Sequence, residues 1–197
     1  MRARVTAAAL ALATGSTLLL TAQATADEPA AASSWCTRQD GHPAAYRAYY
    51  DNGAELTPLG TIRELCHFQS SKDHTQLVLP TDTLAADAPT LASLAYTRKP
   101  ALPAHPVGNP SAAYCAKLGG TTQFGERKSE TGGWIKKGDP VDRDHLHNMC
   151  MFADGSAIDA WGLTYHTAGV IRGADLKNKF RAHVPPIVAA RGGNQAE

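Results

Sequence analysis

The sequence lacks an excess of charge of either sign, a long apolar run in its interior and the common catalytic motifs. It has 19 Lys and Arg residues against 18 Asp and Glu residues, a balance that argues against a nucleic-acid binder and against a helix on an anionic membrane surface. No Gly-x-Ser-x-Gly elbow is present for a nucleophilic serine. No two cysteines are separated by two residues, as they are in a zinc ribbon. The sequence therefore predicts no cofactor and no nucleic-acid partner.

The N-terminus has the three parts of a secretory signal peptide. Arg2 and Arg4 form a basic start, an apolar stretch continues to Leu20, and small residues lead up to Ala26. We therefore predict that residues 1–26 are a signal peptide and that the protein is secreted and extracellular. An uncleaved membrane anchor is the alternative, but the apolar stretch is shorter than the ~20 residues of a transmembrane helix and is interrupted by small polar residues. No later apolar run is long enough to span a bilayer, so the mature protein is predicted to have no membrane span.

Composition divides the remaining chain into two ordered blocks. The Ala-rich residues 27–33 are predicted to be disordered, as chain ends often are. Three prolines predict an extended linker over residues 99–107, and residues 183–197 have the composition of a flexible tail. The two blocks between these segments are residues 34–98 and residues 108–182.

The two blocks share an order of residues that indicates a diverged duplication. An aromatic residue precedes Cys36 and Cys115, a Gly follows each of them five residues later, and a second Cys comes at Cys66 or Cys150. Export favours disulfides over metal binding, but four cysteines allow three pairings and their number does not choose among them. If the blocks are copies, Cys36 pairs with Cys66 and Cys115 with Cys150. Chance similarity is the alternative.

These patterns predict an α+β fold of two tandem small units. Each unit is expected to be a helix packed on a short antiparallel β-sheet and stapled by one disulfide. In the second block, Asn109 and Pro110 suit the first positions of a helix, and Asp154-Gly155 suits a hairpin turn. Units this small bury little apolar surface, and a bridge across such a loop contributes roughly 3 to 4 kcal/mol in the chain-entropy model.

Residues 109–161 carry a set of motifs in a characteristic order. The matching residues are Asn109-Pro110-Ser111-Ala112-Ala113-Tyr114-Cys115, Gly119-Gly120, Cys150-Met151-Phe152-Ala153-Asp154-Gly155-Ser156 and Trp161. In this order they resemble a secreted bacterial family that carries the label hemolysin, a small domain of unknown function. The chain after the signal peptide resembles the tandem actinobacterial form of that family. The resemblance implies a fold and a compartment, and it implies no catalytic residues.

Two departures from the family pattern bear on the disulfides. Ile158 stands where the family has its third Cys, and the family's last Cys, near Arg172-Gly173, is absent as well. The joint loss implies that those two bond each other in the family, which leaves Cys115 with Cys150 here. Membrane lysis, the activity that the label suggests, is disfavoured because no run of about ten alternating residues could form a membrane-crossing strand.

Aromatic residues are the leading candidates for a binding surface. Trp134 follows a Gly pair, and Tyr46, Tyr49 and Tyr50 cluster around Arg47. Exposed Trp and Tyr near Arg are typical of binding surfaces, although packing between the two units is an equally good explanation. The leading interpretation is a secreted, non-catalytic binding or inhibitor-like module whose partner is an extracellular protein or a glycan.

A metal-dependent hydrolase is the alternative interpretation. His145 and His147, within the segment Asp139–His147, would share one face of an extended chain, and Asp144 could add a third metal ligand. A polar surface loop explains the same residues more simply. Because nothing else in the sequence indicates catalysis, a binding protein is favoured over an enzyme.

Overall fold

The described residues form helices and antiparallel strands in mixed order, which confirms the α+β class. The computed structural model describes residues 27–98, 101–102, 107–124, 131–166 and 169–185. The helices are α1 (Asp27–Arg38), α2 (Thr81–Leu84), α3 (Leu91–Arg98), α4 (Pro110–Lys117) and α5 (Ala160–Thr164). The strands are β1 (His42–Asp51), β2 (Leu56–Gln69), β3 (Gln76–Pro80), β4 (Thr131–Lys136), β5 (Met149–Met151) and β6 (Ala157–Asp159). The predicted signal peptide, most of the predicted linker and the tail from residue 186 lie outside the described residues.

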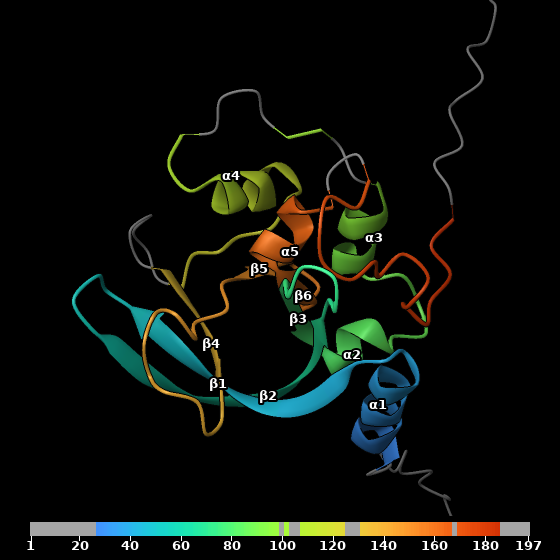
Figure 1. Cartoon of the computed structure of the whole chain (residues 1–197), viewed down its shortest axis with the longest axis horizontal. Coiled ribbons are helices and arrows are strands. Elements are labelled where there is room, and N and C mark those ends of the chain that lie inside the picture. The colour runs from blue at the N-terminus through green and yellow to red at the C-terminus, as the bar shows by residue number, and fades with distance from the viewer. Residues whose placement is uncertain (1–26, 99–100, 103–106, 125–130, 167–168, 186–197) are drawn as a thin grey trace, which may run out of the picture.

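The larger sheet joins the two predicted units. Its strand order is β3-β2-β1-β4, and each neighbouring pair is antiparallel. Strands β1, β2 and β3 come from the first block, whereas β4 comes from the second (Figure 1). The second sheet consists of β5 and β6 alone. The prediction of one separate sheet for each unit is therefore wrong, because β1 pairs across the linker with β4.

Two clusters of buried side chains pack the sheets and helices together. The larger one contains both disulfide bonds, Cys36–Cys66 and Cys115–Cys150, and this is the pairing that the duplication predicted. The smaller cluster packs Leu65 and Val78 of the large sheet against Met149 and Ala157 of the small one. The apolar core thus continues from the first block into the second.

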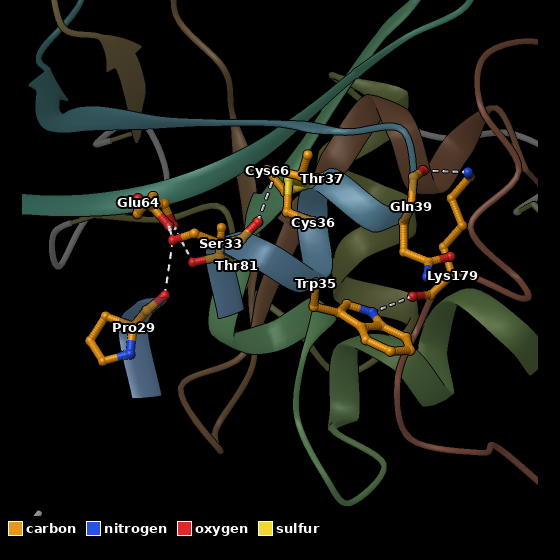
Figure 2. Close-up of a disulfide and its surroundings, with 10 residues drawn as sticks. All are labelled: Pro29, Ser33, Trp35, Cys36, Thr37, Gln39, Glu64, Cys66, Thr81 and Lys179. Atoms are coloured by element: carbon orange, nitrogen blue, oxygen red, sulfur yellow. Dashed lines mark hydrogen bonds between the residues drawn. A yellow bond between two sulfur atoms is a disulfide. The ribbon is translucent and has the colours of Figure 1, made fainter. Parts of the chain in front are cut away.

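Residues 27–33 are helical, so the prediction of disorder is wrong. They begin α1, whose three consecutive alanines favour a helix and whose Ala32 is only 5% exposed. The hydroxyl of Ser33 donates a hydrogen bond to Glu64 on β2. Figure 2 shows this contact beside the Cys36–Cys66 bond, together with the hydrogen bond from Trp35 Nε1 to the carbonyl of Lys179 at 2.8 Å. These contacts anchor the second half of α1, and low complexity alone does not reveal them.

The two disulfide bonds have matching surroundings. Gly41 donates its N–H to the Cys36 carbonyl at 3.0 Å, and Gly120 donates its N–H to the Cys115 carbonyl at 3.0 Å. A Cβ atom built on either glycine would lie within contact distance of both sulfur atoms of the neighbouring bond. Each glycine therefore lets the backbone pass directly over a disulfide, where a side chain would not fit.

The strand register around the two bonds also matches. The residue after each glycine pairs with the residue after the second Cys of the bond, His42 with His67 and Thr121 with Met151. In each block the strand that follows the hairpin leads directly into a short helix, β3 into α2 and β6 into α5. Among the described residues, no helix is both long and apolar enough to cross a bilayer.

Candidate functional site

The aromatic residues predicted to form a binding surface are mostly buried. Tyr46 is 1% exposed, Trp134 7% and Tyr49 8%, and Tyr50 is half-buried. Tyr46 and Trp134 belong to the smaller core cluster. The prediction of an exposed surface at these four residues is therefore wrong, and packing explains three of them.

Close packing of neighbouring backbones explains why Trp134 is buried in the core. The glycines before it belong to strand β4 and not to a loop, because β4 pairs with β1. A Cβ on Gly132 would meet the carbonyl oxygen of Tyr49, and a Cβ on Gly133 would meet that of His147. The two glycines let neighbouring backbones approach closely, and the Trp134 ring then enters the core between the sheets.

The structure separates the residues predicted to bind a metal. His145 turns back to Asp142, with Nδ1 2.6 Å from Oδ1, whereas His147 faces Asp159 with an Nδ1–Oδ2 distance of 3.5 Å. Asp144 joins neither pair. In the parts of the chain that the structure describes, no three His, Cys, Asp or Glu side chains lie where they could hold one metal ion.

Ion pairs in the loop between β4 and β5 shift pKa values and hold the loop in place. The hydrogen bond that the His145 imidazole donates to the Asp142 carboxylate raises the pKa of His145 above its ordinary value. Arg143 forms two hydrogen bonds with the carboxylate of Asp51, at 2.9 and 3.0 Å. The Arg143 guanidinium is the main cause of the lowered pKa of Asp51, and a hydrogen bond from the Gly53 N–H adds to it. The loop is therefore held to the first block by ionic contacts.

Two of the larger surface clefts have no aromatic side chain among the described residues of their walls. One, of about 630 Å³, lies beside α4 and is lined largely by small side chains, and its charged residues Asp51 and Arg143 neutralise each other. The other, of about 1010 Å³, lies between α1 and α2. There Arg63 pairs with Asp82 at 2.9 Å. Alanines of α1 and of the segment after α2 form part of the wall. Neither described lining contains an aromatic side chain that could stack on a ligand.

A third cleft, of about 370 Å³, has a different lining, and we name it the Trp161 cleft. Its walls come from the loop before β3, the loop before β5 and helix α5 with the segment after it. Its lining includes Gln76, His147, Asn148, Asp159, Trp161, Tyr165 and Arg172. The cleft therefore combines two aromatic rings with amide, imidazole, carboxylate and guanidinium groups.

The aromatic wall is formed by Trp161 and Tyr165, with Arg172 against the Tyr165 ring. Trp161 and Tyr165 are four residues apart on and just after α5, so their side chains lie on the same side of the helix. Their ring centroids are 5.7 Å apart at an interplanar angle of 26°. The Arg172 guanidinium carbon lies 3.8 Å from the Tyr165 centroid. Trp161 and Tyr165 are only partly buried, so both rings can be reached from the cleft that they line.

His147 and Asp159 form the polar floor of the cleft. Asp159 is 5% exposed and caps α5, because its Oδ1 accepts a hydrogen bond from the Gly162 N–H at 2.7 Å. Its second oxygen faces His147, whose side chain is 20% exposed. The ring of His147 also meets the buried ring of Tyr46 edge-on, with centroids 6.0 Å apart. Burial, aided by nearby carboxylates, raises the pKa of Tyr46 to about 12.

Asp73, which also lines the cleft, holds the backbone at its edge through hydrogen bonds. Its Oδ2 accepts a hydrogen bond from the Gly173 N–H at 3.0 Å, and its Oδ1 accepts one from the Thr75 N–H at 3.0 Å. These bonds, led by the one from Gly173, hold the pKa of Asp73 well below its usual range. The Ile171 N–H donates to the Tyr165 carbonyl at 2.8 Å. The backbone on both sides of Arg172 is thus anchored to the walls of the cleft.

The sequence indicated part of this cleft. His147 was a metal candidate, and the spacing of Trp161 and Tyr165 was compatible with a helical turn. Arg172 and Asp159 carry no local signal, because their positions depend on contacts with residues far away in the chain. No protein-family model, no curated protein and no solved structure matches the chain.

Proposed function

We propose that this protein is a secreted, non-catalytic binding module that holds a glycan in the Trp161 cleft. The observation that carries the proposal is the partly exposed Trp161–Tyr165 pair above a floor of polar planar side chains. The proposed binding surface is therefore not the set of residues that the sequence suggested but the Trp161 cleft. The kind of function stays the same.

The lining suits a sugar ring better than an apolar ligand. A pyranose presents an apolar C–H face that an indole ring can cover, and a rim of hydroxyls that need both donors and acceptors. Tyr165 contacts both Trp161 and Arg172, so we assign the partly exposed ring of Trp161 as the stacking surface. Gln76 and Asn148 carry amides that donate and accept, and His147 adds an imidazole. These groups can orient hydroxyls around a stacked ring.

Glycan binding is tested on an array of neutral and charged oligosaccharides, followed by calorimetry with the best binder. We expect Trp161→Ala to weaken that binding roughly tenfold or more, because a buried aromatic contact dominates small binding sites. Trp35→Ala is the matched control. It removes a half-buried Trp that hydrogen-bonds Lys179 outside the cleft, and it should leave the affinity unchanged. An array without any bound glycan refutes the proposal, as does equal binding by a folded Trp161→Ala variant.

We further propose that the chain is exported and that its two blocks arose by duplication. The shared disulfide–glycine arrangement and the shared strand register support duplication. Two disulfides suit an oxidising compartment. Intact mass spectrometry of protein from culture medium is the test of export. A chain that begins at Asp27 with both bonds formed is expected, whereas a chain found only inside the cells, with residues 1–26 retained, contradicts export.

A further inference from the structure

We infer that the glycan bound in the Trp161 cleft carries an anionic group, a carboxylate or a sulfate ester, which Arg172 holds. This inference rests on the proposed function and names the class of sugar. Its basis is the state of the charged groups around the cleft, because each carboxylate there has donors and the guanidinium has no anionic partner among the described residues.

Arg172 is exposed and held in one orientation. Its guanidinium stacks 3.8 Å from the Tyr165 centroid, and the backbone on either side is anchored through Ile171 to Tyr165 and through Gly173 to Asp73. Stacking occupies one face of the guanidinium and leaves the N–H donors at its edge. Among the described residues, no carboxylate lies within ion-pair distance of Arg172. A planar fork of free donors on an aromatic ring matches the geometry of a carboxylate or sulfate.

Both carboxylates that line the cleft already accept hydrogen bonds from the protein. Asp73 accepts hydrogen bonds from the Gly173 and Thr75 backbone through separate oxygens. Asp159 accepts from the Gly162 N–H and faces His147 with its other oxygen. Neither forms an ion pair with Arg172, so a ligand anion does not have to displace an internal partner from the guanidinium. This lack of competition favours an anionic ligand over a neutral one, since an incoming anion gains a charge-assisted bond that the free protein does not make.

Arg38 offers a contrast, because it is an exposed arginine near an aromatic ring outside the cleft. Arg38 lies 5.1 Å from the ring of Trp35, outside the cleft. Arg38→Gln removes the same charge from a similar stacked position, and it therefore controls for the loss of net positive charge. Arg172→Lys keeps the charge but loses the fork, so it separates bidentate recognition from simple attraction.

The experiment compares three arms of an oligosaccharide array: neutral, carboxylate-bearing and sulfated glycans. A matched pair within it is galacturonic acid trisaccharide and its methyl ester, which have the same ring shape and differ in charge. We expect binding in the carboxylate or sulfate arm, and the arm that responds identifies the anion. Arg172→Gln should weaken that binding roughly tenfold to a hundredfold, as expected for loss of a charged hydrogen bond. Arg38→Gln should leave it unchanged, and Arg172→Lys should fall between.

Each contrary outcome has a distinct meaning. Binding confined to neutral glycans, lost in Trp161→Ala but kept in Arg172→Gln, overturns the anionic ligand and leaves the proposed function in place. Binding to no arm overturns both. Equal loss in Arg172→Gln and Arg38→Gln shows that net charge is the cause, and it overturns the role of the Arg172 fork.

Discussion

Replacing either glycine that lies over a disulfide should destabilise the protein by steric crowding. A Cβ on Gly41 would lie 2.9 Å from Cys36 Sγ and still closer to its bonded partner, and a Cβ on Gly120 would lie 3.0 Å from Cys115 Sγ. Neither glycine has a positive φ, so alanine can adopt the backbone conformation and the penalty comes from space alone. The sulfur atoms cannot swing away, because each belongs to a buried bond.

The magnitude follows from overpacking. An extra methyl group forced into a packed interior typically costs about 1–3 kcal/mol, and for a protein of this size each kcal/mol lowers Tm by roughly 2 to 4 °C. Gly60→Ala is the matched control, because a Cβ there would have no atom within 4 Å and its φ is not positive. That variant should change the free energy of unfolding by less than about 0.5 kcal/mol.

Urea denaturation of the oxidised proteins measures the difference, with equal m-values as the condition for comparing midpoints. Gly41→Ala and Gly120→Ala should both lose stability, and by similar amounts, because their surroundings match. If both behave like Gly60→Ala, the close approach to the sulfurs is refuted. If only one loses stability, the equivalence of the two blocks is refuted.

Two further predictions concern charge pairs. Arg143→Ala should raise the pKa of Asp51 toward its ordinary value of 3.8 and slightly lower the stability near neutral pH, as measured by NMR titration and urea denaturation. Because the folded pKa of Asp51 is depressed, its contribution is complete above the unfolded value and is lost as the pH falls through the folded one; an unchanged acid profile in Arg143→Ala would contradict the assignment. Asp142→Asn should lower the raised pKa of His145 toward 6.5 in a histidine NMR titration, whereas a His145 pKa that does not move would show that Asp142 is not its main partner.

Local signals in the sequence predicted local structure well. Asn109 caps α4 by accepting a hydrogen bond from the Ser111 N–H at 2.9 Å, with Pro110 directly after it. Gly155 has a φ of 79° in the turn after β5, as the Asp154-Gly155 pair predicted. These features depend on a few neighbouring residues, so the sequence alone contains what determines them.

Features that depend on distant contacts were predicted poorly. The pairing of β1 with β4 buries Trp134, and the glycines that indicated a loop are present because two backbones pass close to them. Alternation in β1 gave a clue, since Tyr46 and Ala48 lie two residues apart and both belong to the smaller core cluster. The stack of Arg172 on Tyr165 has no such clue, because it arises only when Asp73 anchors the loop from another part of the chain.

Indole N–H signals in a two-dimensional ¹⁵N NMR spectrum test the location of the binding site most directly. The chain has three tryptophans, so each reports on one place: Trp134 in the core, Trp35 beside Lys179 and Trp161 at the cleft. Titration with the glycan selected on the array should shift the Trp161 signal progressively and leave the other two in place. A bound glycan that shifts Trp35 or Trp134 while the Trp161 signal stays still would contradict the account.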